Sequence, residues 1–188
     1  MKMAKHAALI FIGFACWQAS AQLAFKDMKL GENILDMAGK ANLHCQATDD
    51  EGAASVLCQM EFQMQVTPPQ FRTLAGVPLS YLALHGPARS GRLENIFMMF
   101  ASRDFDVVKQ AYADRYPSLH CRTTMFRSRR GAEHDQEVCR AEAGSGVIEL
   151  RKRNGSENDS SVSISSRAWL EWQKALDRQT AHKGKNDL

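Results

Sequence analysis

The tripeptide Leu-His-Cys occurs at residues 43–45 and again at residues 119–121, and this recurrence constrains the fold more than any other feature. Each copy is preceded by a helix-like stretch and followed by one further cysteine, Cys58 or Cys139. Recurrence of a whole pattern at a fixed spacing is typical of duplicated structural units. We therefore expect two copies of one disulfide-closed unit.

Residues 1–21 have the three parts of a secretory signal peptide. Lys2 and Lys5 form a basic start, residues 7–17 are apolar, and Ala19-Ser20-Ala21 is a small-residue cleavage site. The apolar run is shorter than the roughly 20 residues that a membrane-spanning helix needs. The sequence predicts cleavage near Ala21 and a soluble protein in the periplasm or outside the cell.

A lipid anchor on Cys16 is the alternative to simple cleavage. Residues 13–16 read Gly-Phe-Ala-Cys, which lacks the aliphatic residue usual three positions before a lipidated cysteine. Cleavage without lipidation is therefore favoured.

Charge gives no indication of a nucleic-acid partner or of stable membrane insertion. The chain has 24 basic and 21 acidic residues, and of these only Lys2 and Lys5 fall in the predicted leader, so the exported chain is almost neutral. Basic clusters at residues 127–130 and 151–153 are typical of solvated hairpin surfaces, and we prefer that interpretation to an anion site.

Four cysteines follow the leader, and thiols in an oxidising compartment tend to form disulfides. Three pairings are possible. Local pairing, Cys45 with Cys58 and Cys121 with Cys139, is favoured because each pair brackets a turn between two strand-like runs. The Cys-x-x-Cys spacing of a catalytic dithiol is absent, so a structural role is predicted.

The clearest strand signal is at residues 58–66, where apolar and polar residues alternate. This alternation predicts a buried face made of Cys58, Met60, Phe62, Met64 and Val66. The opposite face, toward water or a partner, would present Gln59, Glu61, Gln63 and Gln65.

Periodicity predicts one helix followed by four strands in each half of the exported chain. The first half has a helix at residues 32–38 and strands at 41–47, 58–66, 74–84 and 93–100. The second half has a helix at 104–116 and strands at 119–126, 136–143, 147–153 and 161–165. A last helix at 167–180 carries Trp169, Trp172 and Leu176 at helical spacing. We expect it to cover a sheet edge or core seam, although paired tryptophans also suit a partner or a glycan.

The predicted fold class is α+β, with two tandem units of one helix plus a four-stranded antiparallel sheet, each with a hairpin disulfide, followed by a C-terminal helix. The expected division is a signal peptide over 1–21, a first unit over 22–100, a second unit over 101–166, and a C-terminal helix with a polar tail over 167–188.

This tandem arrangement resembles the secreted beta-lactamase inhibitor protein family and related small periplasmic modules. The two Leu-His-Cys blocks, Cys58 and Cys139 carry the resemblance, which extends over nearly the whole exported chain. It implies binding of a partner protein across exposed sheet faces. No contact residue of the family matches a position here, and the helical segments are shorter than the family's helix-loop-helix. The resemblance therefore implies a binding surface, without the inhibitory activity itself.

The chain carries no Gly-x-Ser-x-Gly elbow, no His-Glu-x-x-His helix and no phosphate-binding glycine loop. The methionines after the leader suit copper(I), but most are in phase with apolar neighbours and so indicate core packing. We expect no catalytic residue, no metal and no cofactor. A hydrolase assembled from residues far apart in the sequence is the enzymatic alternative.

The sequence thus predicts an exported, non-enzymatic protein-binding or inhibitor-like module whose partner is an envelope or secreted protein. The candidate contact residues are Gln59, Glu61, Gln63, Gln65, His44 and His120. The two histidines should lie on the sheet face opposite the core if their neighbouring cysteines point inward. A structural factor in cell-envelope assembly is the alternative function.

Overall fold

The computed structural model describes residues 23–50, 53–60, 66–127, 131–144 and 146–186. The helices are α1 (Ile34–Ala41), α2 (Phe105–Arg115) and α3 (Arg167–Asn186), with 3-10 turns η2 (Pro69–Phe71) and η3 (Ser102–Asp104). The strands are β1 (Ala24–Phe25), β2 (Met28–Lys29), β3 (His44–Asp50), β4 (Ala53–Gln59), β5 (Thr73–Leu74), β6 (Val77–Pro87), β7 (Asn95–Ala101), β8 (His120–Arg127), β9 (Glu133–Ala143), β10 (Gly146–Arg151) and β11 (Asp159–Ser166).

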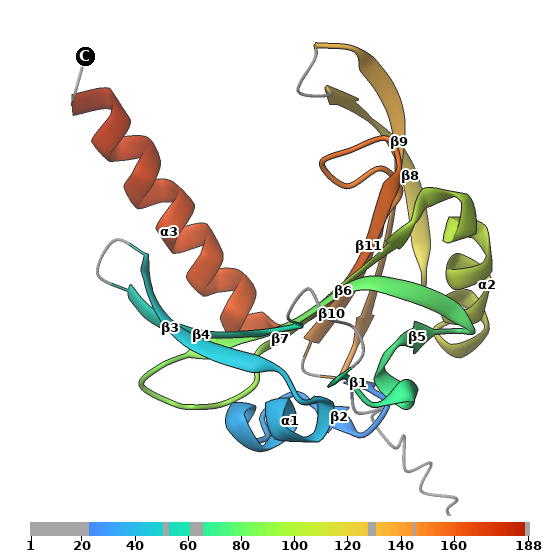
Figure 1. The fold of residues 1–188 in the computed structure, drawn as a ribbon. Coiled ribbons are helices and arrows are strands. Elements are labelled where there is room, and N and C mark those ends of the chain that lie inside the picture. The colour runs from blue at the N-terminus through green and yellow to red at the C-terminus, as the bar shows by residue number, and fades with distance from the viewer. Residues whose placement is uncertain (1–22, 51–52, 61–65, 128–130, 145, 187–188) are drawn as a thin grey trace, which may run out of the picture.

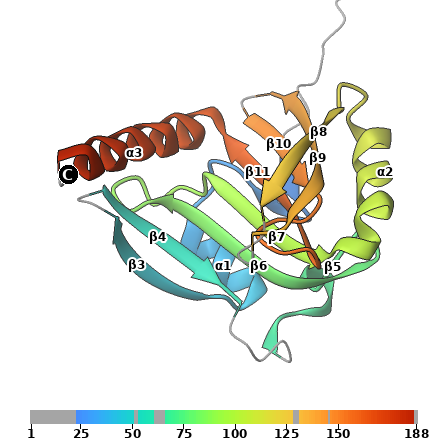
Figure 2. The same ribbon diagram turned by 90° about the horizontal axis from the view of Figure 1, so that it is seen from above.

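A single nine-stranded antiparallel sheet forms the body of the protein, with a separate two-stranded ribbon, β1–β2 (Figures 1 and 2). The strand order is β3-β4-β6-β7-β11-β10-β9-β8, and β5 pairs with β6 off this path. Successive strands of each half of the chain are neighbours, so most connections are short hairpins.

The predicted pair of tandem units, each with its own four-stranded sheet, is wrong. Strand β7 pairs with β11 along its whole length, with Ile96 opposite Ile164 and Phe97 opposite Ser163, so one sheet crosses the expected boundary at residues 100–101. The physical reason is that two separate sheets would each have left an open edge there. Pairing β7 with β11 satisfies the backbone groups of both edges. The α+β class itself is confirmed.

The alternating strand predicted at residues 58–66 is also misplaced, because β4 begins at Ala53 and only Cys58 and Gln59 of the predicted range belong to it. Strand β4 ends at Gln59, and the next residue, Met60, is buried and donates its N–H to the Leu82 carbonyl at 3.0 Å. Val66 has half of its surface exposed and so does not continue a buried face. Residues 61–65, which include the predicted contact residues Glu61, Gln63 and Gln65, lie outside the described residues.

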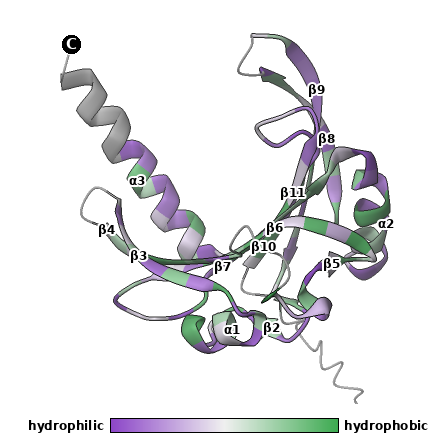
Figure 3. Ribbon diagram, viewed as in Figure 1, coloured by the Kyte–Doolittle hydropathy of each residue, from purple (hydrophilic) through white to green (hydrophobic). Residues whose placement is uncertain are grey.

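The hydrophobic core lies on one face of the sheet, under α1, α2 and the β1–β2 ribbon (Figure 1). Strand alternation puts Leu84, Ile96 and Ile164 in register on this face, and all three are fully buried. Phe100 and Phe105 fill the core where β7 leads into α2. Figure 3 shows hydrophilic residues predominating on β9 and on the coloured first turns of α3, away from this core.

Each disulfide joins the two outermost strands at one edge of the sheet. Cys45 in β3 is bonded to Cys58 in β4, and Cys121 in β8 to Cys139 in β9, so the local pairing predicted from the sequence is confirmed. Both pairs are directly opposite in strand register. Two disulfides suggest an oxidising, exported environment. Within the described residues, the helices all lack the length and apolarity needed to cross a membrane.

Helix α3 begins on the sheet face opposite α1 and α2. Ser166 starts the helix, because its hydroxyl accepts a hydrogen bond from the Trp169 N–H at 3.0 Å. From there α3 runs away from the body of the molecule (Figures 1 and 2). The expectation that this helix covers a sheet edge or core seam is therefore wrong, and its first turns instead form a wall beside the sheet.

Candidate functional site

The sheet face opposite α1 and α2 has a distinct chemistry, and we call it the α3 face because α3 starts on it. Strand register places on it, near the middle of the sheet, Tyr81, His85, Asn95, Phe97, Met99, Glu149, Arg151, Ser161, Ser163 and Ser165. Aromatic, amide, hydroxyl and charged groups are thus mixed on a surface built from inner strands.

A hydrogen-bonded network at the junction of β7 and β11 anchors this face. The Asn95 amide nitrogen donates to the Ser163 hydroxyl at 2.8 Å and to the Ser165 hydroxyl at 2.7 Å, and the two hydroxyl oxygens are 3.1 Å apart. Asn95 is buried, so these bonds offset the cost of removing its amide from water. The network holds the strand that leads directly into α3.

Aromatic rings form the wall between the sheet and α3. The ring of Trp169 is stacked on that of Trp172, with centroids 4.5 Å apart, and its other neighbour is the His85 imidazole at 5.7 Å. Burial lowers the pKa of His85 from its ordinary value of 6.5, because water is excluded from the charged imidazolium. His85 is therefore neutral at pH 7, and the wall carries no charge.

The indole nitrogen of Trp169 is a donor without an acceptor among the described residues. Trp169 is only 4% exposed, so bulk water does not reach the nitrogen in this arrangement. Buried indole N–H groups usually have a hydrogen-bond partner. This unsatisfied donor therefore marks the base of α3 as unusual.

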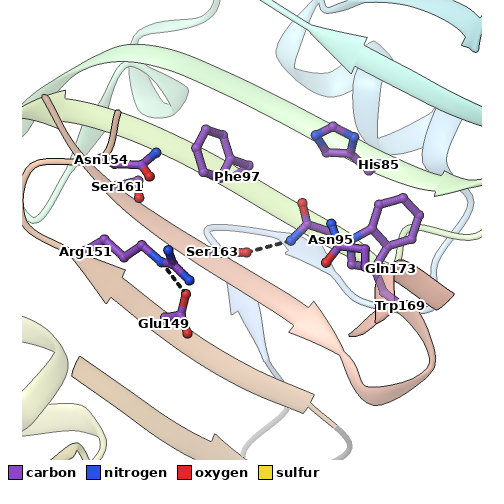
Figure 4. Close-up of a pocket in the computed structure, with 10 residues that line it drawn as sticks. All are labelled: His85, Asn95, Phe97, Glu149, Arg151, Asn154, Ser161, Ser163, Trp169 and Gln173. Atoms are coloured by element: carbon purple, nitrogen blue, oxygen red, sulfur yellow. Dashed lines mark hydrogen bonds and ion pairs between the residues drawn. The ribbon is translucent and has the colours of Figure 1, made fainter. Parts of the chain in front are cut away.

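A pocket of about 360 Å³ lies on the α3 face beside this wall (Figure 4). At one end Figure 4 shows Trp169 and Gln173 beside Asn95, and at the other the side chains of Glu149 and Arg151. The Arg151 Nε is 2.6 Å from a carboxylate oxygen of Glu149, so these two charges neutralise each other. Phe97, Ser161, Ser163, His85 and Asn154 complete the lining.

A second pocket of about 570 Å³ continues along α3 toward β3 and β4. It shares His85, Trp169 and Gln173 with the first pocket. Its other lining residues are Thr48, Ser55, Leu57, Trp172, Leu176 and Asp177. Together the two pockets form one elongated cleft along the base of α3, which we call the α3 cleft.

Farther along β6 and β7, three large side chains form a partly exposed patch on the same face. Tyr81 is opposite Met99 in register, and the rings of Tyr81 and Phe97 meet edge to face with centroids 6.2 Å apart. Tyr81, Phe97 and Met99 are all only half-buried. The Tyr81 hydroxyl donates to the side-chain oxygen of Gln59 at 2.6 Å, which fixes the position of both side chains. We call these three residues the aromatic–methionine patch.

The structure brings together only part of the predicted contact set. His44 and Gln59 are directly opposite in register on β3 and β4, and alternation places both on the α3 face. His120 is exposed on the same face but in β8, at the far edge of the sheet. The repeated histidines are therefore separated by the width of the sheet and do not form one site.

Sequence reasoning missed most residues of the α3 cleft. The strand predicted at residues 74–84 stops before His85, which lies within β6 because β6 extends to Pro87. Ser161, Ser163 and Ser165 were expected only as part of a short strand. Their spacing of two was the available signal, because it places three hydroxyls on one face of that strand.

Among the described residues, one group has the composition of a metal site, namely Cys121, Glu137 and Cys139. The two sulfurs are bonded to each other, so neither is a thiolate that could bind a metal. No metal site follows from this cluster while the disulfide is intact.

No family model, no curated protein and no solved structure matches the chain. The resemblance to beta-lactamase inhibitor proteins accordingly stays a prediction.

Proposed function

We propose that the chain is an exported, non-enzymatic binding module that recognises a protein partner through the α3 face of its sheet. The single observation that carries this proposal is the aromatic–methionine patch of Tyr81, Phe97 and Met99, half-exposed on inner strands. Tyrosine, phenylalanine and methionine are enriched in the cores of protein interfaces.

The surroundings of the patch fit an interface of this kind. Gln59 lies on one side of it, and Ser161 is opposite Met99 on the other, so polar groups surround an apolar centre. The patch lies on strands with neighbours on both sides, which fixes the backbone that carries it before a partner arrives. Such preorganisation lowers the entropic cost of binding.

Site-specific photo-crosslinking in living cells tests the proposal. Tyr81→p-benzoylphenylalanine places a reactive ring of similar shape in the patch. The matched control is Val107→p-benzoylphenylalanine, since Val107 is 54% exposed but lies on α2, which covers the opposite face of the sheet.

We expect the Tyr81 variant, and not the Val107 variant, to form one discrete protein adduct. Unlabelled wild-type chain should reduce that adduct by competition. Equal adducts from both positions, or no adduct from Tyr81, would contradict recognition through the α3 face. Purified chain that turns over a small ester or amide would contradict the non-enzymatic part.

A further inference from the structure

The α3 cleft differs from the aromatic–methionine patch because it is concave and lined by flat rings alternating with hydrogen-bonding groups. Its two parts, of about 360 and 570 Å³, share His85, Trp169 and Gln173. Volumes of this size suit small-molecule ligands rather than the flat surface of a folded protein. Because the parts are joined end to end along α3, the cleft suits an elongated ligand.

The cleft offers flat apolar surfaces at several points along its length. Phe97 and Trp169 line the smaller part, and Trp172, stacked on Trp169 at 4.5 Å, lines the larger part. Aromatic faces of this kind pack against flat C–H surfaces, while their polar atoms hydrogen bond at the edge. A ligand that carries both flat C–H faces and many hydroxyl groups meets these conditions.

The smaller part of the cleft is electrically balanced. Glu149 and Arg151 form an ion pair at 2.6 Å, and His85 is neutral. The other polar lining groups are hydroxyls and amides, contributed by Ser161, Ser163, Asn95, Asn154 and Gln173. Such groups both donate and accept hydrogen bonds, which suits a neutral ligand with several hydroxyls.

The unsatisfied Trp169 indole N–H adds a specific requirement for an acceptor. Gln173 lines the same cleft one turn further along α3 and is exposed, so its side chain has room to move aside. A ligand oxygen that takes its place can accept the hydrogen bond that Trp169 lacks in the free protein.

We propose that the α3 cleft binds a neutral oligosaccharide, with one sugar ring against Phe97 and the next against Trp172, both of which are partly exposed. This goes beyond the proposed protein-binding function. The two sites share Phe97 and Ser161, whereas Trp169, Trp172 and Asn154 lie in the cleft alone. Bonds neither form nor break in the bound ligand.

Intrinsic fluorescence is a direct reporter for this proposal. The chain has three tryptophans, and Trp17→Phe leaves only Trp169 and Trp172, both in the cleft, whether or not the leader is removed. The exported Trp17→Phe chain would be titrated with chitotriose, with cellotriose and, as a peptide comparison, with trialanine. Ligand concentrations up to about 10 mM cover weak binding sites.

We expect a saturable change in indole emission with at least one trisaccharide. Asn154→Ala should weaken that binding about tenfold, as loss of one hydrogen-bonding partner does. Trp172→Ala should weaken binding by a similar factor. Its affinity would be measured by calorimetry, because this variant lacks one of the two tryptophans that report binding by fluorescence. Glu171→Gln is the matched control, because Glu171 lies exposed on α3 in a pair with Lys174 and lines neither pocket.

A response to trialanine alone, no saturable response to either trisaccharide, or equal affinity in all variants would overturn the proposal. Circular dichroism of each variant separates loss of binding from loss of fold. Failure here leaves the Tyr81 crosslink unaffected, so the two proposals are tested independently.

Discussion

The two disulfide-linked hairpins lie at opposite edges of one sheet, yet their surroundings differ. The β3–β4 hairpin packs against α1, and its half-buried Cys45 is bonded to the fully buried Cys58. In β8 most side chains are exposed, including Cys121, and the β8–β9 hairpin extends away from the body (Figure 1). A disulfide therefore adds to side-chain packing at the β3–β4 edge, and it takes the place of such packing at the β8–β9 edge.

The largest expected effect comes from the core that both edges share. Phe100 is fully buried in β7, so Phe100→Ala should lower the free energy of unfolding by about 3–5 kcal/mol. Met125 in β8 is 61% exposed, and Met125→Ala should change the free energy of unfolding by less than about 0.5 kcal/mol. Urea unfolding measures both values. A large loss in Met125→Ala would show that the β8–β9 edge has a packed core of its own.

Removing each disulfide in turn sharpens the comparison directly. The cysteines are separated by 13 and 18 residues, so chain entropy alone predicts a similar loss of about 3 kcal/mol for each double alanine variant. Hydrogen exchange should separate them, because α1 still covers β3 and β4 whereas β8 has little cover. We expect local loss of protection in β8 of Cys121→Ala/Cys139→Ala, and retained protection in β3 of Cys45→Ala/Cys58→Ala. Equal loss of hydrogen-exchange protection in β3 and β8 would show that α1 does not stabilise its edge of the sheet more than the uncovered edge is stabilised.

Acid should act through His85, which lies against Trp169 at the base of α3. Because burial lowers the pKa of His85 below its ordinary 6.5, the unfolded chain binds more protons than the folded chain in the window below pH 6.5. The contribution of neutral His85 is therefore fully present above that value and is lost as pH falls through the folded pKa. His85→Gln should flatten this dependence in urea titrations at several pH values, while exposed His120→Gln should not. If the free energy of unfolding of His85→Gln depends on pH as steeply as that of the wild type, a group other than His85 causes the acid sensitivity.

The smallest effect is expected at the tip of the β8–β9 hairpin. Arg127 pairs with Glu133 at 2.5 Å, but the two side chains are 71% and 53% exposed. Arg127→Gln should therefore cost less than about 1 kcal/mol, and salt should reduce that cost further. Thermal unfolding at low and high salt measures it. A larger, salt-independent loss would mean that this ion pair, and not the disulfide, holds the hairpin.

The sequence predicted the position of most strands but not how they join. The pattern of strand-like runs between turn residues located strands near β8, β9, β10 and β11, although β8 is mostly exposed and β10 mostly buried. It could not predict the pairing of Ile96 with Ile164, because the periodicity of a strand describes its faces and carries no information about its edges. Single sheets and paired sheets therefore give the same pattern.

The candidate site was harder to predict because its parts are far apart in the chain. Trp169 and Trp172 were recognised at helical spacing, but Asn95 and His85 come close to them only after β7 pairs with β11. Glycine is typical of turns, and Gly86 lies just beyond the strand predicted at residues 74–84. In the structure it lies inside β6, where the Arg92 carbonyl leaves no room for a Cβ. A close backbone approach, and not a turn, requires that glycine.

The place of β11 in the strand order has a consequence for biogenesis. This strand follows all the other described strands in the chain but lies between β7 and β10, so its position stays vacant until residues 159–166 have been synthesised. A polypeptide interrupted before residue 159 would present two unpaired edges from inner strands, which are templates for aggregation. Quality control of this protein should therefore depend on completion of its C-terminal segment more than on any event nearer the N-terminus.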